Sequence, residues 1–354
     1  MLGVGRATSG IKPPALLGMQ VFGVAAAYYA GTYLAVLTTP PGLPVTSLWV
    51  SAGVALACLL LFGVKVWPGI FVGSFLSNMT AVPALEAVLV ASGNTIAPVC
   101  AYLLLRRVGF RIGLDRIKDA VSFVLLGAFA AMSLSASIGT AALVAAESWP
   151  AKDFLRLWFA WWSSDVLGVL VVTPLLLVLR EFRLARHVGW SRRIEFVALL
   201  LATLALTIVA NFTFGLVFLG FPLIVFAALR FQLGGVAPCA SLVAAVTIES
   251  AGRGYRPFEG RGLLESVFIL QVFNGALVLT GLLLAVVITQ WHRARVDVQL
   301  TCFQLADAVG RLQRSMLPDL EKHGDAGKVP SRTVGEEGSP RSLRDSGRKW
   351  REAS

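Results

Sequence analysis

The stretch that decides the fold is Leu155–Arg180, which reads LRLWFAWWSSDVLGVLVVTPLLLVLR. An α-helix needs roughly 20 mostly apolar residues to cross a bilayer, and this stretch exceeds that length with Asp165 as its single acidic residue. A carboxylate at the bilayer centre costs about 2.5–3.5 kcal/mol, so it usually faces a protein interior or a water-filled cavity. The stretch therefore predicts a membrane-spanning helix whose Asp165 faces other helices.

The residues next to Asp165 allow two interpretations of this carboxylate. Trp161 and Trp162 lie about one turn before it, and Ser163 and Ser164 are its immediate neighbours. Tryptophans near the start of a span commonly anchor the helix at the membrane interface, and Asp165 would then only bond a neighbouring helix. Indole and hydroxyl donors also suit a small pocket that senses a ligand or a proton. We keep both interpretations and treat Asp165, Trp161 and Trp162 as candidate sensing residues.

The composition predicts a membrane protein around this stretch. Of the 354 residues, 56% are hydrophobic and 14% are charged, and the mean hydropathy is +0.74, whereas soluble domains carry about 25% charged residues. We expect an all-α, polytopic integral membrane helix bundle. The expected spans are 15–38, 46–63, 66–79, 83–105, 119–146, 155–179, 194–212, 214–230, 234–250 and 265–290. Tight turns between the seventh, eighth and ninth segments keep eight spans as an alternative to ten.

The basic residues follow the loops between these segments. The formal net charge is +11, and with a cytoplasmic N-terminus sixteen Lys and Arg fall on the cytoplasmic side and five on the other. Positive charge concentrates in cytoplasmic loops of membrane proteins. We therefore expect a multi-pass protein of the inner (plasma) membrane, in contact with the lipid bilayer, with both termini in the cytoplasm. Basic residues scattered in this way do not form a nucleic-acid interface.

A second pair of polar residues lies in the fourth segment. Glu86 and Asn94 are eight residues apart, which is about two helical turns and places them on one face. A shared polar face in a membrane helix predicts an interior stripe. We add Asn94 and Glu86 to the candidate ligand-binding or sensing residues.

The motifs that would indicate an enzyme or a metal site are missing from the sequence. Four cysteines show no paired spacing, and no phosphate-binding loop, zinc-protease motif or nucleophile elbow occurs. We expect no disulfide, no metal, no cofactor and no catalytic residue.

Five stretches resemble a known family when they are taken in order. They are SLWVSAGVALACLLLFGVKVWPGIFVGSFLSN (47–78), GNTIAPVCAYLLLRRVGF (93–110), LDRIKDAVSFV (114–124), SLSASIGTAALV (133–144) and WFAWWSSDVLGVLVVTPLLL (158–177). The ordered set resembles the bacterial membrane-associated sensor domain of type one, the MASE-one family. The resemblance implies an integral membrane sensory domain of a signal-transduction protein, placed before a cytoplasmic output module such as a histidine kinase, a cyclic-dinucleotide enzyme or a serine phosphatase.

One stretch departs from the family pattern. The family usually has a proline-bearing WPPxG-like turn where this chain reads Trp49-Val50-Ser51-Ala52-Gly53. Without the prolines, we expect the helix break at this point to be softened.

The chain changes from apolar to polar after the last span, and residues 291–317 predict a juxtamembrane signalling helix. Its apolar residues alternate by four and three, which is the spacing of a short coiled coil. The residues of this heptad stripe are Val298, Cys302, Leu305, Val309, Leu312 and Met316. We expect a homodimer through this helix, and a helix lying on anionic lipid is the alternative.

Residues 312–318, LQRSMLP, resemble the linker that leads into SpoIIE-like PPM-type serine phosphatases. The metal-binding aspartates of those enzymes do not follow, and residues 318–354 are too polar to bury a core, which predicts a disordered tail. We therefore interpret the tail as a truncated output domain.

These observations predict a cytoplasmic N-terminus (1–14), a membrane-associated sensor domain (15–290), a signalling helix (291–317) and a tail (318–354). The domain would relay a signal from an unknown small ligand or from the membrane. A secondary transporter of a small solute is the alternative, although no internal repeat supports it.

Overall fold

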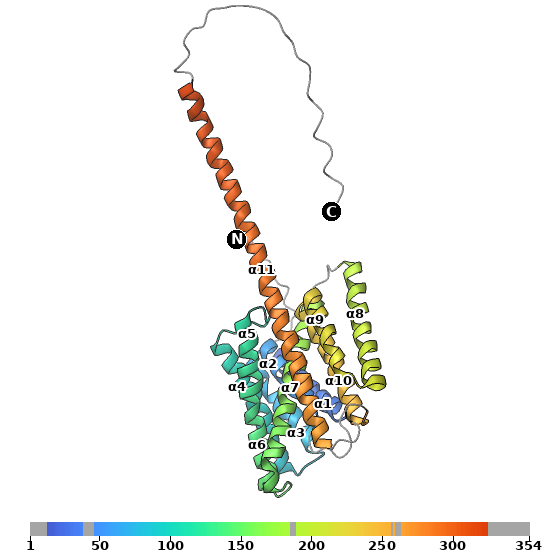
Figure 1. The fold of residues 1–354 in the computed structure, drawn as a ribbon. Helices are drawn as coiled ribbons and strands as arrows, with labels where there is room; N and C mark the ends of the chain where they lie inside the picture. Colours follow the sequence, from blue (N-terminus) through green and yellow to red (C-terminus); the bar gives the residue numbers. More distant parts are fainter. Residues whose placement is uncertain (1–12, 38–45, 185–188, 256–257, 259–262, 325–354) are drawn as a thin grey trace, which may run out of the picture. The chain divides into compact units, whose positions relative to one another are not determined.

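The computed structural model describes residues 13–37, 46–184, 189–255, 258 and 263–324. Over these residues the structure is all-α without a strand, which confirms the predicted fold class. The helices are α1 (Pro13–Leu37), α2 (Val50–Phe62), α3 (Trp67–Asn78), α4 (Ala84–Arg107), α5 (Ile117–Ser122), α6 (Ala131–Ala145), α7 (Phe154–Leu184), α8 (Trp190–Val209), α9 (Gly220–Phe231), α10 (Leu233–Gly252) and α11 (Leu263–Gly324) (Figure 1). A π-helical stretch, Phe123–Ala130, joins α5 to α6 without a break.

Every predicted spanning segment contains a helix, but the helices differ in length. Within the described residues, seven helical stretches are long and apolar enough to cross a membrane. The helices α2, α3 and α9 have 13, 12 and 12 residues, fewer than the roughly 20 that a straight crossing needs. The bundle therefore combines full spans with shorter apolar helices.

The backbone before α2 corrects the expectation of a softened helix break. Residues 46–49 are not helical, and α2 begins only at Val50, with Trp49 at φ −86° and ψ 85°. The Trp49 amide instead donates to the carbonyl oxygen of Ser164 at 3.2 Å. The break is present without proline because the extended backbone at Trp49 pairs with α7.

The helix α7 packs against α2 through glycines. A side chain at Gly168 would meet the Trp49 carbonyl, and a side chain at Gly53 would meet the Gly168 carbonyl. Thr173 donates to the Gly53 carbonyl at 3.0 Å. This close backbone approach is typical of membrane helices, in which small residues permit tight packing.

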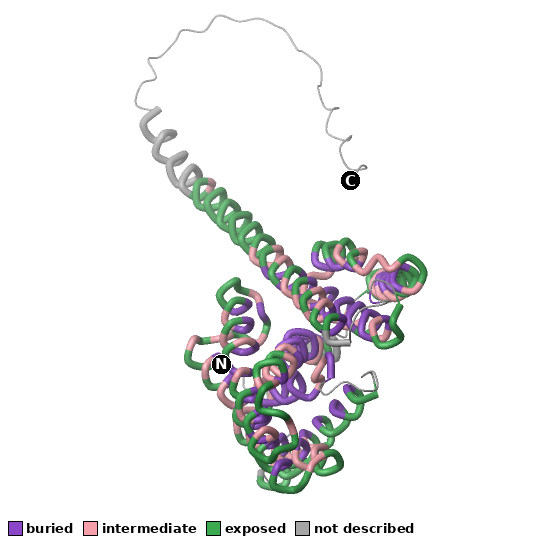
Figure 2. The backbone as a smooth tube through the Cα atoms, turned by 60° about the horizontal axis from the view of Figure 1, so that its bottom comes forward, coloured by how far each residue is buried: buried purple, intermediate pink, exposed green. Residues whose placement is uncertain are grey.

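The structure divides into two units at Ala294, within α11. Residues up to Ala294 form the bundle, in which buried residues gather on the inner sides of the helices (Figure 2). The second unit begins at Arg295, and its described part is a single helix. Every residue from Arg295 to Val309 is exposed. We predict disorder for residues 318–354, but residues 318–324 continue α11, and residues 325–354 lie outside the described residues.

Candidate functional site

The Asp165 carboxylate is buried inside the bundle, as the sequence predicts. The residue is 1% exposed, and its Oδ1 atom has no hydrogen-bond partner. Its side chain interacts with Ser135 of α6. A buried polar atom that lacks a partner is rare in folded proteins, which makes Asp165 the leading candidate for a functional residue.

A chain of polar side chains extends from Ser135 across the bundle. The Ser135 hydroxyl donates to Asn94 Oδ1 at 2.9 Å, and Asn94 Nδ2 donates to the Ser74 hydroxyl at 3.0 Å. The Tyr28 hydroxyl interacts with Ser74 and Asn94, and it accepts a hydrogen bond from Trp49 Nε1 at 3.4 Å. Tyr28 also lies close enough to Asp165 for an electrostatic interaction. We call these residues the buried polar network: Tyr28, Trp49, Ser74, Asn94, Ser135 and Asp165.

The network draws on elements that are far apart in the sequence. The helices α1, α3, α4, α6 and α7 each contribute one side chain, and Trp49 precedes α2. The helices approach closely because small residues lie between them; for example, a side chain at Gly73 would meet Tyr28 Cβ at 2.8 Å. A change in the hydrogen bonding of one member can therefore alter the packing of several helices.

The two tryptophans predicted beside Asp165 occupy different places. Trp161 packs on Gly139 of α6, where an added Cβ would lie 2.6 Å from the indole ring. Trp162 donates to the Phe129 carbonyl at 2.9 Å and stacks on Trp158. None of these contacts involves Asp165, so the two tryptophans lie outside the hydrogen bonds of the site.

Glu86 is buried but lies apart from the network. Its carboxylate accepts a hydrogen bond from Ser148 at 2.9 Å, and Ser148 lies in the turn that follows α6. Glu86 and Asn94 are both buried on α4, but Glu86 lies in the first turn of the helix, two turns away from Asn94. Of the predicted site residues, the structure thus brings together Asp165 and Asn94, with Ser135 between them.

Four network residues do not belong to the sequence-derived set of candidates. Ser135 lies in a run of small residues whose spacing indicates only helix packing. Tyr28 is one of three tyrosines in α1, and Ser74 is one of two serines in α3. Trp49 precedes a helix. Their roles depend on contacts between helices, which a hydropathy pattern does not contain.

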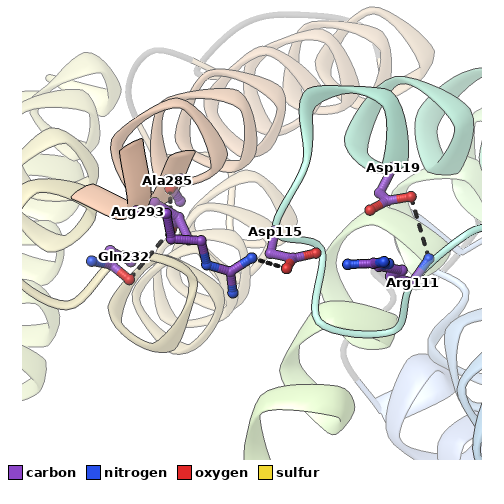
Figure 3. Close-up of polar contacts among 7 residues, drawn as sticks. Arg111, Asp115, Asp119, Gln232, Ala285 and Arg293 are labelled. Carbon is purple, nitrogen blue, oxygen red and sulfur yellow. Dashed lines mark hydrogen bonds and ion pairs between the residues drawn. The ribbon is translucent and has the colours of Figure 1, made fainter. Parts of the chain in front are cut away.

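A second polar cluster joins α11 to the loop between α4 and α5 (Figure 3). Arg293 forms an ion pair with Asp115 of this loop, and Thr289 bonds to Gln232 at 3.3 Å. Asp119 accepts a hydrogen bond from the Arg111 amide at 3.3 Å. Gln232 of this cluster and Leu114, which precedes Asp115, adopt positive φ angles. The cluster ties the last part of α11 in the bundle to its neighbours.

The described part of the chain has no group of three His, Cys, Asp or Glu side chains that could hold a metal ion. The buried polar network contains one carboxylate, one amide and several hydroxyl groups. Such a set suits hydrogen bonding to a small polar ligand, or the transfer of a proton, better than metal binding.

The fold and this site define a class of polytopic membrane helix bundle with a polar interior. The MASE1 family model matches residues 19–292, which is most of the chain. The chain belongs to the MASE1 family and is a multi-pass membrane sensor domain. Neither the curated proteins nor the solved structures contain a match. The family match ends at residue 292, at the start of the predicted signalling helix, and does not support the phosphatase linker.

Proposed function

We propose that this MASE1 domain senses through the buried polar network and relays the signal along α11 to a cytoplasmic output module. The observation that carries the proposal is the buried Asp165, whose Oδ1 lacks a partner. Its side chain interacts with Ser135, from which hydrogen bonds run through Asn94 to Ser74 across α6, α4 and α3. A small polar ligand or a proton at this carboxylate changes the hydrogen bonding of the network. A ligand shifts a conformational equilibrium only through such differential contacts.

Several contacts connect the bundle to α11 before its exposed part begins. Asn274 accepts a hydrogen bond from Thr247 of α10 at 3.1 Å, and Arg293 pairs with Asp115. A shift among the helices of the bundle would therefore move α11 through these contacts. In our proposal the second unit forms a parallel homodimer, because Val298, Leu305 and Val309 of the heptad stripe are exposed and a partner helix would bury them.

The proposed orientation places both termini in the cytoplasm of a bacterial cell, as the excess of basic residues in the corresponding loops favours. The output module is proposed by resemblance: the LQRSMLP segment favours a serine phosphatase of the SpoIIE-like class. The domain itself performs no catalysis in this proposal.

The relay is tested by fusing residues 1–317 to an output domain of measurable activity and inserting residues after Gly310. A helix turns by about 100° per residue, so two residues rotate the output by roughly 200°, whereas seven restore the phase to within about 20°. We expect the two-residue insertion to change the basal output and the seven-residue insertion to preserve it. Equal activity of both insertions would contradict the relay.

Transport of a small solute is the second candidate. It is favoured by the buried carboxylate and by prolines inside α4, α7 and α10, since interrupted helices with buried charges also build transporter sites. Uptake of labelled solutes into vesicles that contain the purified protein separates the two. Saturable uptake that Asp165→Asn abolishes would favour the transporter.

A further inference from the structure

A large groove lies on the other face of α7, between α7 and α11. Its volume is about 840 Å³, within the range of roughly 300–1,000 Å³ that is usual for ligand sites. Its walls are mostly apolar, with residues such as Trp162, Leu167 and Phe268 along its length. Fourteen residues separate its ends on each helix, Arg156 to Leu170 and Glu265 to Leu279, which corresponds to about 21 Å at 1.5 Å per residue.

The polar residues of the groove are not scattered. Arg156 and Glu265 both line the groove near the residues where α7 and α11 begin, and Ser163 and Gln271 lie about two turns further along each helix. The groove therefore has one end with a positive and a negative residue, then the polar pair Ser163 and Gln271, and beyond them a long apolar part. That order matches a membrane lipid more closely than it matches a small polar solute.

The polar pair Ser163 and Gln271 contains a hydrogen-bond donor without a partner. Ser163 donates to Gln271 Oε1 at 2.6 Å, which fixes the orientation of the amide. Gln271 Nε2 has no hydrogen-bond partner. This nitrogen is shielded from solvent, so a ligand acceptor pairs with it when the amide turns toward the groove. Because an unpaired buried amide costs free energy, that turn is favoured when an acceptor lies at this depth.

We propose that the groove binds one phospholipid with a zwitterionic phosphate and ammonium headgroup. The phosphate lies near Arg156, whose guanidinium suits phosphate oxygens, and the ammonium lies on the Glu265 side. The ester carbonyls, which lie on the hydrocarbon side of the phosphate, reach the depth of Gln271. A free fatty acid lacks both the ammonium and these acceptors. This proposal does not depend on the proposed relay function.

Gly275 provides a variant that fills the groove. It lines the groove, and nothing lies within 4 Å of a Cβ placed there. Gly275→Leu therefore adds a side chain to open space and does not strain the backbone. Gly23→Leu is the matched control, because Gly23 is a helical glycine of α1 with equally open surroundings and it is not part of the groove.

The test uses the delipidated protein in detergent, titrated with phosphatidylethanolamine, phosphatidylglycerol and a long-chain fatty acid and followed by native mass spectrometry. We expect phosphatidylethanolamine to bind most tightly. Gly275→Leu should abolish its binding, and Arg156→Gln should weaken it about tenfold through the lost charge-assisted hydrogen bond. Gly23→Leu should bind like the wild type.

Three results would overturn the proposal. The first is unchanged phosphatidylethanolamine binding in both Gly275→Leu and Arg156→Gln. The second is a fatty acid that binds as tightly as phosphatidylethanolamine. The third is a change from dimer to monomer in Gly275→Leu, because the groove would then be a contact between two copies. If Gly275→Leu fails to fold, Arg156→Gln still decides, because Arg156 is exposed.

Discussion

The hydroxyl of Ser135 donates a hydrogen bond to the side-chain oxygen of Asn94 over 2.9 Å, inside the apolar bundle. Both residues are buried, at 1% and 6% exposure. This bond joins α6 to α4, and Ser135 also interacts with the Asp165 carboxylate of α7. The account of this domain as a sensor depends on that connection.

Asn94→Ala should destabilise the bundle. The substitution removes the bonds to Ser135 and Ser74 and leaves both hydroxyls buried. Leaving buried groups unpaired costs about 1–3 kcal/mol, so the free energy of unfolding in detergent should fall by that order. Ser92→Ala on the same helix is the control, because the Ser92 hydroxyl donates to the Val88 carbonyl one turn earlier in α4 and not to another helix. Equal effects of the two substitutions would argue against a special role for Asn94.

Gly168→Ala tests the contact between α7 and the backbone at Trp49. The new Cβ meets the Trp49 carbonyl, which is backbone and cannot rotate away. Overpacking of this kind costs about 1–3 kcal/mol, so the midpoint of thermal unfolding should fall. Gly23→Ala, where nothing lies within 4 Å, should leave the midpoint unchanged or raise it. A Gly168→Ala protein as stable as the wild type would show that the helices separate easily.

Cys302 reports on the proposed dimer of the second unit. It is exposed, whereas Cys58 and Cys239 are buried, and it lies in the heptad stripe between Val298 and Leu305. In a parallel dimer the two Cys302 residues face each other, so mild oxidation of membranes should give a disulfide-linked dimer on a non-reducing gel. Cys302→Ser should remove this band. A band that persists in Cys302→Ser, or that never forms, would contradict the parallel arrangement.

The ion pair between Arg293 and Asp115 should contribute little to stability. The Arg293 side chain is 57% exposed and the Asp115 side chain 13%. Because solvent reaches the guanidinium, we expect the pair to behave like an exposed pair, which is usually worth about 0–1 kcal/mol. A double-mutant cycle with Arg293→Gln and Asp115→Asn, measured by unfolding in detergent, should give a coupling in that range that weakens with salt. A coupling several times larger, or one that salt leaves unchanged, would show that the pair is shielded from solvent.

The membrane architecture could be predicted from the sequence because apolar runs of spanning length have few alternative interpretations. The burial of Asp165 followed from the same reasoning, since a carboxylate within such a run must avoid the acyl chains. The partners of Asp165 could not be predicted. Tyr28, Ser74 and Ser135 are ordinary residues of apolar helices, and they come together because α1 packs on α3, α3 on α4, and α4 on α6.

The break before α2 shows a related limit of sequence reasoning. Proline would have marked it, but here the break is held by the Trp49 amide bond to Ser164 and by the absence of a side chain at Gly168. These contacts join residues more than a hundred positions apart. The groove beside α11 also escapes a linear pattern, because its two walls come from separate helices.

The central claim is that the network around Asp165 controls the output, and Asp165→Asn in the fusion of residues 1–317 to an output domain tests it most directly. The substitution keeps the shape of the side chain and removes its ability to carry a charge. Glu86→Gln is the matched control, because Glu86 is also a buried carboxylate but bonds to Ser148 outside the network. With membrane levels and thermal stability equal, we expect Asp165→Asn to change the output about tenfold, equivalent to roughly 1.4 kcal/mol, and Glu86→Gln to leave it unchanged. Output that ignores Asp165→Asn, or that responds equally to Glu86→Gln, would contradict the account.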